Sequence, residues 1–326
     1  MKAFVYSCRS FDEEPMYRRF AAEMGIDLET TDKLPSLENA KLAEGSDFIS
    51  ILTNRIPPEL EDVYKRMGIK LLVTRTIGYD HIDIAHAHEI GLPVAHVTYD
   101  TSGVAEYTVM MIMMALRKWK EMEIRSARNN FSLKGLLGGE VSKSKIGIIG
   151  AGKIGIDVLK FLSGFGGELF YCNRSPSPEA DRYAKRLSFD ELLAQCDVIS
   201  LHLEHNKETH HIIDTSAFAK MKDGTVFVNT ARGPLVDSGA LLNALDSGKV
   251  SVAALDVIEG ELPYYYRDCS NEEMKWELME ELRKRPNAIV MHHMGFYYEQ
   301  AISDMVRNSL IAMKAAGEGK DIPLRL

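Results

Sequence analysis

The sequence has no long hydrophobic run. Its most apolar stretch, from Val109 to Leu116, is far shorter than the about 20 residues that a helix needs to cross a bilayer. The N-terminal residues MKAFVYSCRS contain no cationic segment followed by an apolar one, which a secretory signal would require. We therefore expect a cytoplasmic protein that has no membrane partner.

Cysteine is scarce, and basic residues are not gathered into a stripe. The formal net charge is −8, which together with the missing basic stripe argues against a nucleic-acid partner. Repeats and low-complexity tracts are also absent. The four cysteines lie far apart and fit no zinc or disulfide spacing, so we expect no metal site and interpret them as free thiols: Cys8, Cys172, Cys196 and Cys269.

The 326 residues alternate between short apolar runs and helical patterns. Nearly continuous apolar runs are typical of strands that are buried on both faces of a parallel sheet. The alternation occurs twice, and the segment after His293 is expected to return to the first part. We therefore predict the α/β class with two doubly wound parallel-sheet domains. The predicted strands are AFVYS, DFISIL, KLLVTRT and PVAHV in the first part, and KIGIIG, ELFYCN, VISLHL, TVFVNTA, VAALDVIEG and AIVMHH in the second.

A long helical pattern, from about Val104 to about Asn129, separates these two parts. We interpret its four methionines as core residues, because methionine commonly fills irregular gaps. A helix that lies between domains or between subunits is the alternative. The methionines are Met110, Met111, Met113 and Met114.

A glycine-rich turn follows the predicted strand KIGII. It has the pattern G-x-G-x-x-G, with Lys153 and Ile154 between the last two glycines: Gly150, Gly152 and Gly155. In such a turn the first glycine makes the bend, the second lets a pyrophosphate approach the backbone, and the third lets the helix pack on the strand. The helix N-terminus then offers unpaired N–H groups to the phosphates. Because the turn lies between a strand and a helix, we predict that these residues bind a dinucleotide.

The end of the next predicted strand is expected to select the nucleotide. An acidic residue there binds the ribose 2′-hydroxyl of NAD, whereas an arginine suits the 2′-phosphate of NADP. This sequence has Cys172, Asn173 and Arg174, and no carboxylate. We therefore expect Asn173 and Arg174 to contact NADP(H), NAD(H) or both, with NADP(H) slightly favoured. The alternative is that Arg174 lies in solvent.

Three candidate catalytic residues stand just beyond predicted strand ends, namely Arg232, Glu261 and His293. The carboxyl ends of parallel strands line one crevice, so these residues can converge although they are distant in sequence. They supply the groups that reduction of a 2-oxo acid needs. Arginine binds a carboxylate with two parallel hydrogen bonds, histidine exchanges a proton near neutral pH, and a carboxylate orients the imidazole and stabilises its charged form.

The remaining histidines are interpreted as ordinary residues. His292 precedes His293, and successive strand residues face opposite ways, so only one of the two can point into the crevice. Four others follow a predicted strand in a polar loop, and we expect them to be solvated at the surface: His202, His205, His210 and His211.

These residues and their order resemble the D-isomer-specific 2-hydroxyacid dehydrogenases, in particular the D-lactate and D-2-hydroxyisocaproate dehydrogenase branch. The likeness runs through nearly the whole chain. The resemblance implies that Arg232 binds the substrate carboxylate, that His293 is the acid/base and that Glu261 is its partner. The segments that carry it are TRTIGYDHID (74–83), GAGKIG (150–155), NTARGPLVD (229–237), ALDV (254–257) and HMGF (293–296).

The resemblance also implies a fold and an assembly. Residues 1–100 and 294–326 would form a smaller, flavodoxin-like substrate domain. Residues 101–293 would form a Rossmann nucleotide-binding domain, through which two copies join as a homodimer. Ala231 and Asp256 would lie beside the cofactor, the latter near the nicotinamide amide.

Five further residues are implied in substrate binding. The backbone N–H groups of Ile77 and Gly78 would bind the substrate carboxylate, and Tyr99 and Phe296 would line the pocket for the substrate side chain. Leu52 stands where strict D-lactate dehydrogenases carry a bulky tyrosine, so we expect a longer, apolar pocket. The alternative is that Leu52 is a core residue, as strand leucines often are.

The chain departs from the family pattern at two places. His292 stands where proline commonly precedes the catalytic histidine, and Cys172-Asn173-Arg174 replaces the acid after the second nucleotide strand. In the latter feature, and in the stretch Tyr264 to Cys269, the chain is similar to the D-lactate dehydrogenases of vancomycin-resistance clusters.

We therefore expect a D-2-hydroxyacid dehydrogenase that reduces pyruvate, or a branched or aromatic 2-oxo acid, to the D-hydroxy acid. A glyoxylate, hydroxypyruvate or phosphoglycerate-type reductase is one alternative, which the sequence around Tyr99 and the tyrosine run after Glu261 disfavour. A non-catalytic protein that senses NAD(H) is another, since one fold hosts many functions. The complete set of catalytic groups argues against it.

Overall fold

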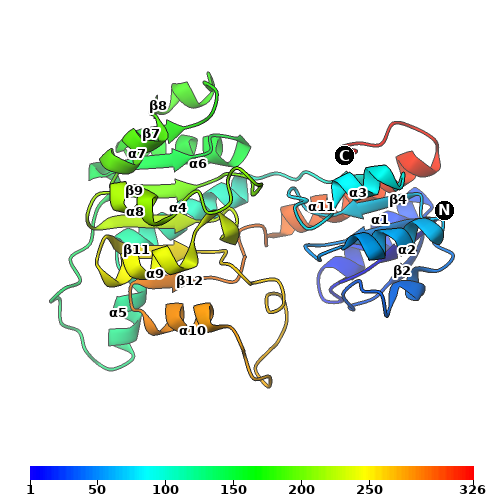
Figure 1. Cartoon of the computed structure of the whole chain (residues 1–326), viewed down its shortest axis with the longest axis horizontal. Helices are drawn as coiled ribbons and strands as arrows, with labels where there is room; N and C mark the ends of the chain where they lie inside the picture. Colours follow the sequence, from blue (N-terminus) through cyan, green and yellow to red (C-terminus); the bar gives the residue numbers. More distant parts are fainter. The chain divides into compact units, whose positions relative to one another are not determined.

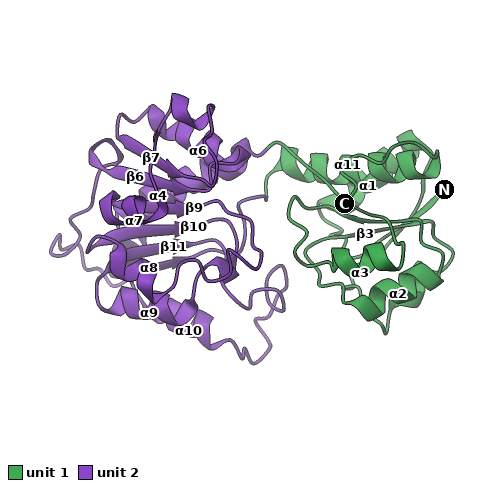
Figure 2. Cartoon of the chain, turned by 45° about the horizontal axis from the view of Figure 1, so that its top comes forward, with its two compact units in different colours: residues 1–100, 297–326 green, residues 101–296 purple.

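A computed structural model describes residues 1–326, which form two compact α/β units (Figure 1). Unit 1 comprises Met1–Asp100 and Tyr297–Leu326, and unit 2 comprises Thr101–Phe296 (Figure 2). No helix is long and apolar enough to cross a membrane. The chain returns to unit 1 after Phe296 rather than after His293, because the backbone N–H groups of Met294 and Gly295 are bound to Asp256 of unit 2.

Unit 1 contains a five-stranded sheet in the order β2-β1-β3-β4-β5, in which every pairing is parallel. This is the flavodoxin-like order, and it confirms the predicted fold. The three central strands are buried along almost their whole length, as their continuous apolar sequences predict. The strands are β1 (Lys2–Val5), β2 (Asp27–Thr30), β3 (Phe48–Ile51), β4 (Leu71–Thr74) and β5 (Val94–His96).

Helices cover both faces of this sheet (Figure 2). The helices α1 (Glu13–Met24) and α11 (Glu299–Gly317) pack together on one face, so the two ends of the chain meet in unit 1. The helices α2 (Pro58–Arg66) and α3 (Ile84–Glu89) pack on the other face. The Tyr17 hydroxyl on α1 links the α1–α11 layer to the sheet. It lies 2.9 Å from Ser50 Oγ on β3 and 3.0 Å from Ser309 Oγ on α11.

A buried ion pair ties the strand ends of unit 1 to α1. The guanidinium of Arg75, just after β4, is fully buried and donates to Glu13 Oε1 at 2.8 Å. It also donates to the backbone oxygens of Tyr6 and Ser7, which follow β1. A buried charge is tolerated only when it is paired and hydrogen-bonded, so this network fixes how β1, β4 and α1 meet.

Unit 2 contains a seven-stranded parallel sheet in the order β12-β11-β10-β9-β6-β7-β8. With β6 counted as its first strand, this is the Rossmann order 3-2-1-4-5-6 extended by one strand. The order reverses between β6 and β9, which is where such sheets bind ligands. The strands are β6 (Lys145–Ile149), β7 (Glu168–Cys172), β8 (Lys185–Arg186), β9 (Val198–Leu201), β10 (Thr225–Asn229), β11 (Val250–Leu255) and β12 (Ala288–Val290).

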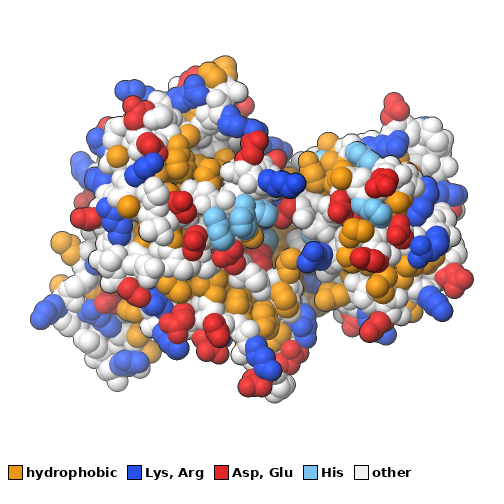
Figure 3. Space-filling model, in the orientation of Figure 1, with side chains coloured by type: hydrophobic (Ala, Val, Ile, Leu, Met, Phe, Trp, Pro, Cys, Tyr) orange, Lys and Arg blue, Asp and Glu red, His pale blue; other side chains and the backbone are white.

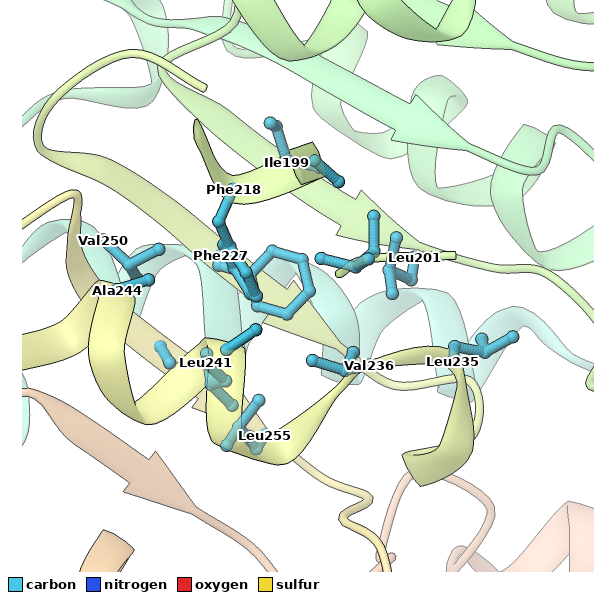
Figure 4. Packing of buried hydrophobic residues seen from close by; sticks show 14 of the residues in the cluster. Ile199, Leu201, Phe218, Phe227, Leu235, Val236, Leu241, Ala244, Val250 and Leu255 are labelled. Carbon is cyan, nitrogen blue, oxygen red and sulfur yellow. The ribbon is translucent and has the colours of Figure 1, made fainter. Parts of the chain in front are cut away.

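Each face of the unit 2 sheet has its own hydrophobic core. On one face Met111 and Ile112 of α4 (Ser102–Leu116) pack near Val158 of α6 (Lys153–Ser163). Figure 4 shows the other face, where the rings of Phe218 and Phe227 pack edge to face with centroids 5.6 Å apart. That face is covered by α7 (Phe189–Gln195), α8 (Thr215–Lys220) and α9 (Ser238–Asp246), while α10 (Glu277–Lys284) flanks β12.

The structure corrects the prediction of one helix from Val104 to Asn129. The segment contains two helices, α4 and α5 (Trp119–Ser126), separated at Lys118, whose backbone is left-handed with φ 52°. The Lys120 side chain donates to backbone oxygens in the last turn of α10 and after it, including that of Ala288 at 2.6 Å. This tertiary contact holds α5 against unit 2, and no glycine or proline in the sequence marks the break.

The interpretation of the four methionines as core residues is also only partly right. Met111 is fully buried, whereas Met110 and Met113 are 40% and 42% exposed. Two strands were not predicted at all. Both β2, with the sequence DLET, and β8, with only two residues, are edge strands that lack a continuous apolar run.

A carboxyl group on α2 is buried without a cationic partner. Glu61 is 0% exposed, and its Oε1 accepts a hydrogen bond of 3.1 Å from the Asp83 backbone N–H. Its Oε2 has no hydrogen-bond partner. Burial raises the pKa of Glu61 from 4.5 to about 7.

We predict that Glu61→Gln stabilises the protein at pH 8 but not at pH 5. The pKa of Glu61 is raised in the folded state, so its contribution to the free energy of unfolding is fully present below pH 4.5. This contribution is lost as the pH rises through 7. Glutamine keeps the acceptor for Asp83, so the gain in unfolding free energy at pH 8 should reach up to about 3 kcal/mol. Urea unfolding at both pH values measures it, with the exposed Glu59→Gln as control. Equal pH dependence in the wild type and Glu61→Gln would contradict the assignment.

Candidate active site

The dinucleotide turn is built at the point where the strand order of unit 2 reverses. The strand β6 ends at Ile149, the turn follows, and α6 begins at Lys153 with Gly152 as its N-cap. Lys153 and Ile154 therefore lie in the first turn of α6, where the helix dipole favours an anion. The turn is held in place because the Gly150 N–H donates to the Cys172 oxygen at the end of β7.

The three glycines meet three different requirements. Gly150 has φ 97°, and a Cβ there would lie 2.7 Å from the His202 backbone oxygen. A Cβ at Gly155 would lie 2.2 Å from the Gly150 oxygen, so only glycine lets the helix approach the turn this closely. A Cβ at Gly152 would meet nothing within 4 Å. The open space beside Gly152 and the N-terminus of α6 fit the pyrophosphate of a dinucleotide.

The residues that follow β7 lie where the adenosine ribose is expected. Asn173 is partly buried, and Arg174 is exposed, with its Nη1 3.3 Å from Glu208 Oε2. Behind them, Arg186 Nη2 donates to the backbone oxygens of Asn173 at 3.0 Å and Arg174 at 3.1 Å. The Arg186 side chain on β8 therefore fixes the course of this turn. The end of β7 carries no carboxylate that would repel a 2′-phosphate.

Arg232 follows β10 in a segment that the neighbouring asparagine holds. Asn229 Oδ1 accepts from the Ala231 N–H at 3.0 Å, and Asn229 Nδ2 donates to the Arg232 oxygen at 2.9 Å. Arg232 Nη1 donates to the Ala231 oxygen at 2.7 Å. Ala231 is buried, whereas Arg232 is partly exposed. The Asn229 side chain thus sets the direction from which the guanidinium leaves the sheet.

His293 and Glu261 form a direct pair. His293 Nδ1 lies 2.6 Å from Glu261 Oε1, and Glu261 Oε2 accepts from the Ile258 N–H at 2.9 Å. The side chains of His293 and Glu261 are 18% and 12% exposed. With Nδ1 bound to the carboxylate, Nε2 is the ring nitrogen that remains to exchange a proton with a substrate. Glu261 is positioned to stabilise the imidazolium.

His292 lies differently. It is exposed, and its ring packs edge-on against Tyr265 with centroids 6.0 Å apart. Of the two consecutive histidines, it is therefore His293 that has the geometry of an acid/base. Both lie beyond β12, which ends at Val290, so strand alternation does not account for the difference.

Of the four histidines predicted to be solvated, His210 is exposed, whereas the other three are only partly exposed. Histidine side chains are visible on the surface of unit 2 in Figure 3, and within this loop His210 stacks on His211 with centroids 4.1 Å apart. His211 in turn lies 2.7 Å from Glu259, while His205 Nε2 lies 3.2 Å from His210 Nδ1. The prediction is wrong for His202, which bonds Ser200 Oγ at 2.9 Å and whose pKa burial lowers to about 3. His202 is therefore neutral at physiological pH.

Asp256 lies directly after β11 and is 1% exposed. Its carboxylate accepts hydrogen bonds from the Tyr107 hydroxyl and from the N–H groups of Met294 and Gly295. A carboxylate has about four acceptor positions, so one remains for a cofactor amide. The contact between Asp256 and the nicotinamide stays a prediction.

Aromatic rings surround His293. The Phe296 ring lies 6.1 Å from the His293 ring and 5.8 Å from Tyr266, which it meets at 90°. Tyr266 has a left-handed backbone with φ 67°, and its hydroxyl donates to the His293 oxygen at 3.3 Å. Sequence reasoning noted the tyrosine run but did not assign Tyr266 to the site. The sequence of three consecutive tyrosines does not indicate which of the rings faces His293.

The predicted substrate residues of unit 1 follow three adjacent strands. Leu52 comes directly after β3 and is 4% exposed. Ile77 and Gly78 follow β4, and the Thr76 hydroxyl donates to the Gly78 oxygen at 2.6 Å. Tyr99 follows β5 and is partly buried. All four therefore lie at the carboxyl edge of the unit 1 sheet, which is the edge where ligands bind in such folds.

The Rossmann order, the glycine turn and the arginine, glutamate and histidine groups at the strand ends define a dinucleotide-dependent oxidoreductase. Comparison with known proteins narrows this class. Residues 109–295 match the family model described as the NAD binding domain of D-isomer specific 2-hydroxyacid dehydrogenases. The chain belongs to the D-isomer-specific 2-hydroxyacid dehydrogenase family, and it is an NAD-dependent oxidoreductase that acts on D-2-hydroxy acids.

Similar proteins cover nearly the whole chain. A D-specific alpha-keto acid dehydrogenase from Enterococcus faecium is 36% identical over 94% of this chain and 94% of its own length. An aromatic 2-oxoacid reductase from Clostridium sporogenes is 37% identical over 96% of each chain. The crystal structure of a D-lactate dehydrogenase from Treponema pallidum superposes with a TM-score of 0.87 at 31% identity, over 100% of this chain and 99% of the other. These comparisons confirm the family that the sequence motifs indicate.

We predict that His293→Ala lowers kcat for 2-oxo acid reduction by ~10²–10⁴-fold, the usual effect of removing a positioned acid/base. Steady-state assays at saturating NADH measure it. His292→Ala is the matched control, because it removes an adjacent imidazole that is exposed and has no carboxylate partner. A wild-type kcat in His293→Ala, or a larger loss in His292→Ala, would show that the other histidine is the acid/base.

Proposed function

We propose that the protein reduces a 2-oxo acid to the D-2-hydroxy acid with Arg232, His293 and Glu261 as its catalytic groups. The observation that carries this proposal is the 2.6 Å contact between His293 Nδ1 and Glu261 Oε1 at the carboxyl edge of the unit 2 sheet. The nicotinamide, when bound, supplies the hydride. His293 Nε2 gives a proton to the carbonyl oxygen as negative charge develops there, and Glu261 stabilises the charged imidazole.

The substrate carboxylate needs a cationic partner and N–H donors. We assign Arg232 to this carboxylate, because its planar guanidinium offers two parallel donors that a lysine does not. The backbone N–H groups of Ile77 and Gly78 are proposed as further donors, by the resemblance described above. The cofactor contacts are proposed for Gly150, Gly152, Lys153, Ile154, Gly155, Asn173, Arg174, Ala231 and Asp256.

We propose that the substrate range extends from pyruvate to branched and aromatic 2-oxo acids. Phe296 and Tyr266 provide aromatic surface next to His293, and Leu52 stands in place of a bulky tyrosine. Tyr99 is proposed to contact the substrate side chain, by the resemblance described above. The names of the relatives, an aromatic 2-oxoacid reductase and a D-specific alpha-keto acid dehydrogenase, are in keeping with this range.

We predict that the wild type turns over pyruvate and that 4-methyl-2-oxopentanoate and phenylpyruvate compete well with it. Each additional buried methylene contributes about 0.8 kcal/mol of binding where space exists. Leu52→Tyr should raise KM for the two larger acids severalfold and leave that for pyruvate nearly unchanged. The assay is a substrate panel with chiral analysis of the product, and Ile51→Val, a change in the core of unit 1, is the control. Turnover of pyruvate alone, with no effect of Leu52→Tyr, would exclude Leu52 from the pocket.

We propose further that the enzyme uses both NADPH and NADH, and that it slightly prefers NADPH. The support is local: the end of β7 carries Cys172, Asn173 and Arg174 instead of an acid, and Arg186 fixes that turn. The Arg174 guanidinium pairs with Glu208, and both side chains are largely exposed. An exposed pair of this kind is weak, so a phosphate can displace the glutamate.

We predict that Arg174→Ala raises KM for NADPH about fivefold to tenfold more than KM for NADH, because only NADPH loses a charge-assisted contact. Glu208→Gln should have the opposite effect, because it removes the competing carboxylate, and it should lower KM for NADPH. Initial rates with both cofactors measure the two ratios. If both cofactors lose equally in Arg174→Ala, or if the wild type does not use NADPH, Arg174 does not bind a 2′-phosphate.

We also propose that two copies join through unit 2 and that the enzyme is cytoplasmic. The support for the dimer is an exposed apolar surface on α4, α5 and the loop that follows, whose members Leu133 and Leu137 are 86% and 90% exposed. Such a surface marks an interaction site. Sedimentation of the wild type measures the assembly directly. All four cysteines are unpaired thiols, the state expected in a reducing compartment.

A further inference from the structure

His293 has an unusual backbone. Its φ is 57°, in the left-handed region that residues with a Cβ rarely adopt. This conformation costs about 1–2 kcal/mol, so it persists only where the surrounding structure imposes it. The chain needs the turn because β12 ends at Val290 and the backbone then bends across the end of β11. The backbone bend from His293 to Gly295 sets the position of the His293 imidazole.

The main-chain contacts of the bend converge on Asp256. The His293 N–H donates to the Asp256 backbone oxygen at 2.8 Å. The next two N–H groups donate to the Asp256 carboxylate, that of Met294 to Oδ1 at 2.8 Å and that of Gly295 to Oδ2 at 3.0 Å. Three consecutive N–H groups are thus bound by one residue, which leaves the segment little freedom.

The Asp256 carboxylate is buried and has no lysine or arginine among its hydrogen-bond partners. A buried charge must be satisfied by hydrogen bonds, and the two backbone N–H groups are not enough for it. The remaining donor is the Tyr107 hydroxyl, 3.0 Å from Oδ1. Burial and the nearby carboxylate raise the pKa of Tyr107, so its hydroxyl keeps its proton and remains a donor.

Tyr107 is well placed to hold this group. It lies in the first half of α4, and the next residue, Thr108, places its Oγ1 2.9 Å from Thr230 Oγ1 beyond the end of β10. The helix is therefore fixed to two adjacent strand ends. A Cβ on Gly295 would lie 3.2 Å from Asp256 Oδ2 and 3.6 Å from the Tyr107 ring, so this contact is already tightly packed.

We propose that Tyr107 is a positioning residue of the active site: its hydroxyl fixes the Asp256 carboxylate, and Asp256 in turn holds the left-handed bend that presents His293. Tyr107 is not itself a catalytic residue, since no contact places it on the reacting atoms. The proposal rests on the proposed role of His293 as the acid/base.

The test is Tyr107→Phe, which removes one oxygen and preserves the ring. We expect kcat for 2-oxo acid reduction to fall about tenfold, the usual scale for losing a hydrogen bond to a charged group. KM for NADH should rise by a smaller factor than kcat falls, because the glycine turn and α6, which are proposed to bind the pyrophosphate, are not touched. Tyr6→Phe is the matched control, since the Tyr6 hydroxyl donates to the backbone oxygens of Asn39 and Ala40 in unit 1. It should retain wild-type kcat.

A double-mutant cycle separates positioning from a general structural role. If Tyr107 acts through the carboxylate, adding Tyr107→Phe to Asp256→Asn should lower kcat much less than it does in the wild type. A full, multiplicative loss in that background would overturn the proposal, and so would an unchanged kcat in the folded single variant. Thermal unfolding of each variant checks that it is folded. A wild type that reduces no 2-oxo acid would instead refute the proposed function.

Discussion

Parallel pairing of every strand is the constraint on which this structure depends. Because all strands of a sheet run in one direction, each loop that leaves a carboxyl end emerges at the same edge. In unit 2 this places the glycine turn, Arg232, Asp256 and the His293 bend at one edge, although they span more than a hundred positions of sequence. The helices that connect parallel strands cover both faces, so the sheets are buried and the edge is left for chemistry.

The chemistry at that edge depends on backbone that is held in costly conformations. Left-handed residues other than glycine occur at His293 and Tyr266, and buried acidic and basic side chains occur at Asp256 and Arg75. Asp256 and Arg75 are each held by several hydrogen bonds to neighbouring elements rather than by one strong contact. The site is therefore precise because its parts are satisfied together, and removing one donor affects a group that is not its direct neighbour.

Much of the fold could be predicted because buried parallel strands have a distinctive sequence. The ten predicted strands all exist, and the glycine turn lies where its pattern requires. The edge strands β2 and β8 escaped because a strand with one solvated side has no continuous apolar run. The break at Lys118 was not predicted because neither glycine nor proline marks it in the sequence. His202 was misjudged since burial depends on what packs over a loop. Tyr107 and Tyr266 were not assigned because their roles arise from tertiary hydrogen bonds.

Unit 1 is assembled from the two ends of the chain, and this has a consequence for synthesis on the ribosome. The helix α1 packs against α11, the Tyr17 hydroxyl reaches Ser309, and the Leu326 N–H donates to the Val94 oxygen. Unit 2 is continuous, so all of its strands have been synthesised before α11 is made. The N-terminal strands of unit 1 must then wait, with one face of their sheet covered by α1 alone, until α11 is made. During that interval, the apolar side of α1 is the part of the nascent chain that most needs a chaperone.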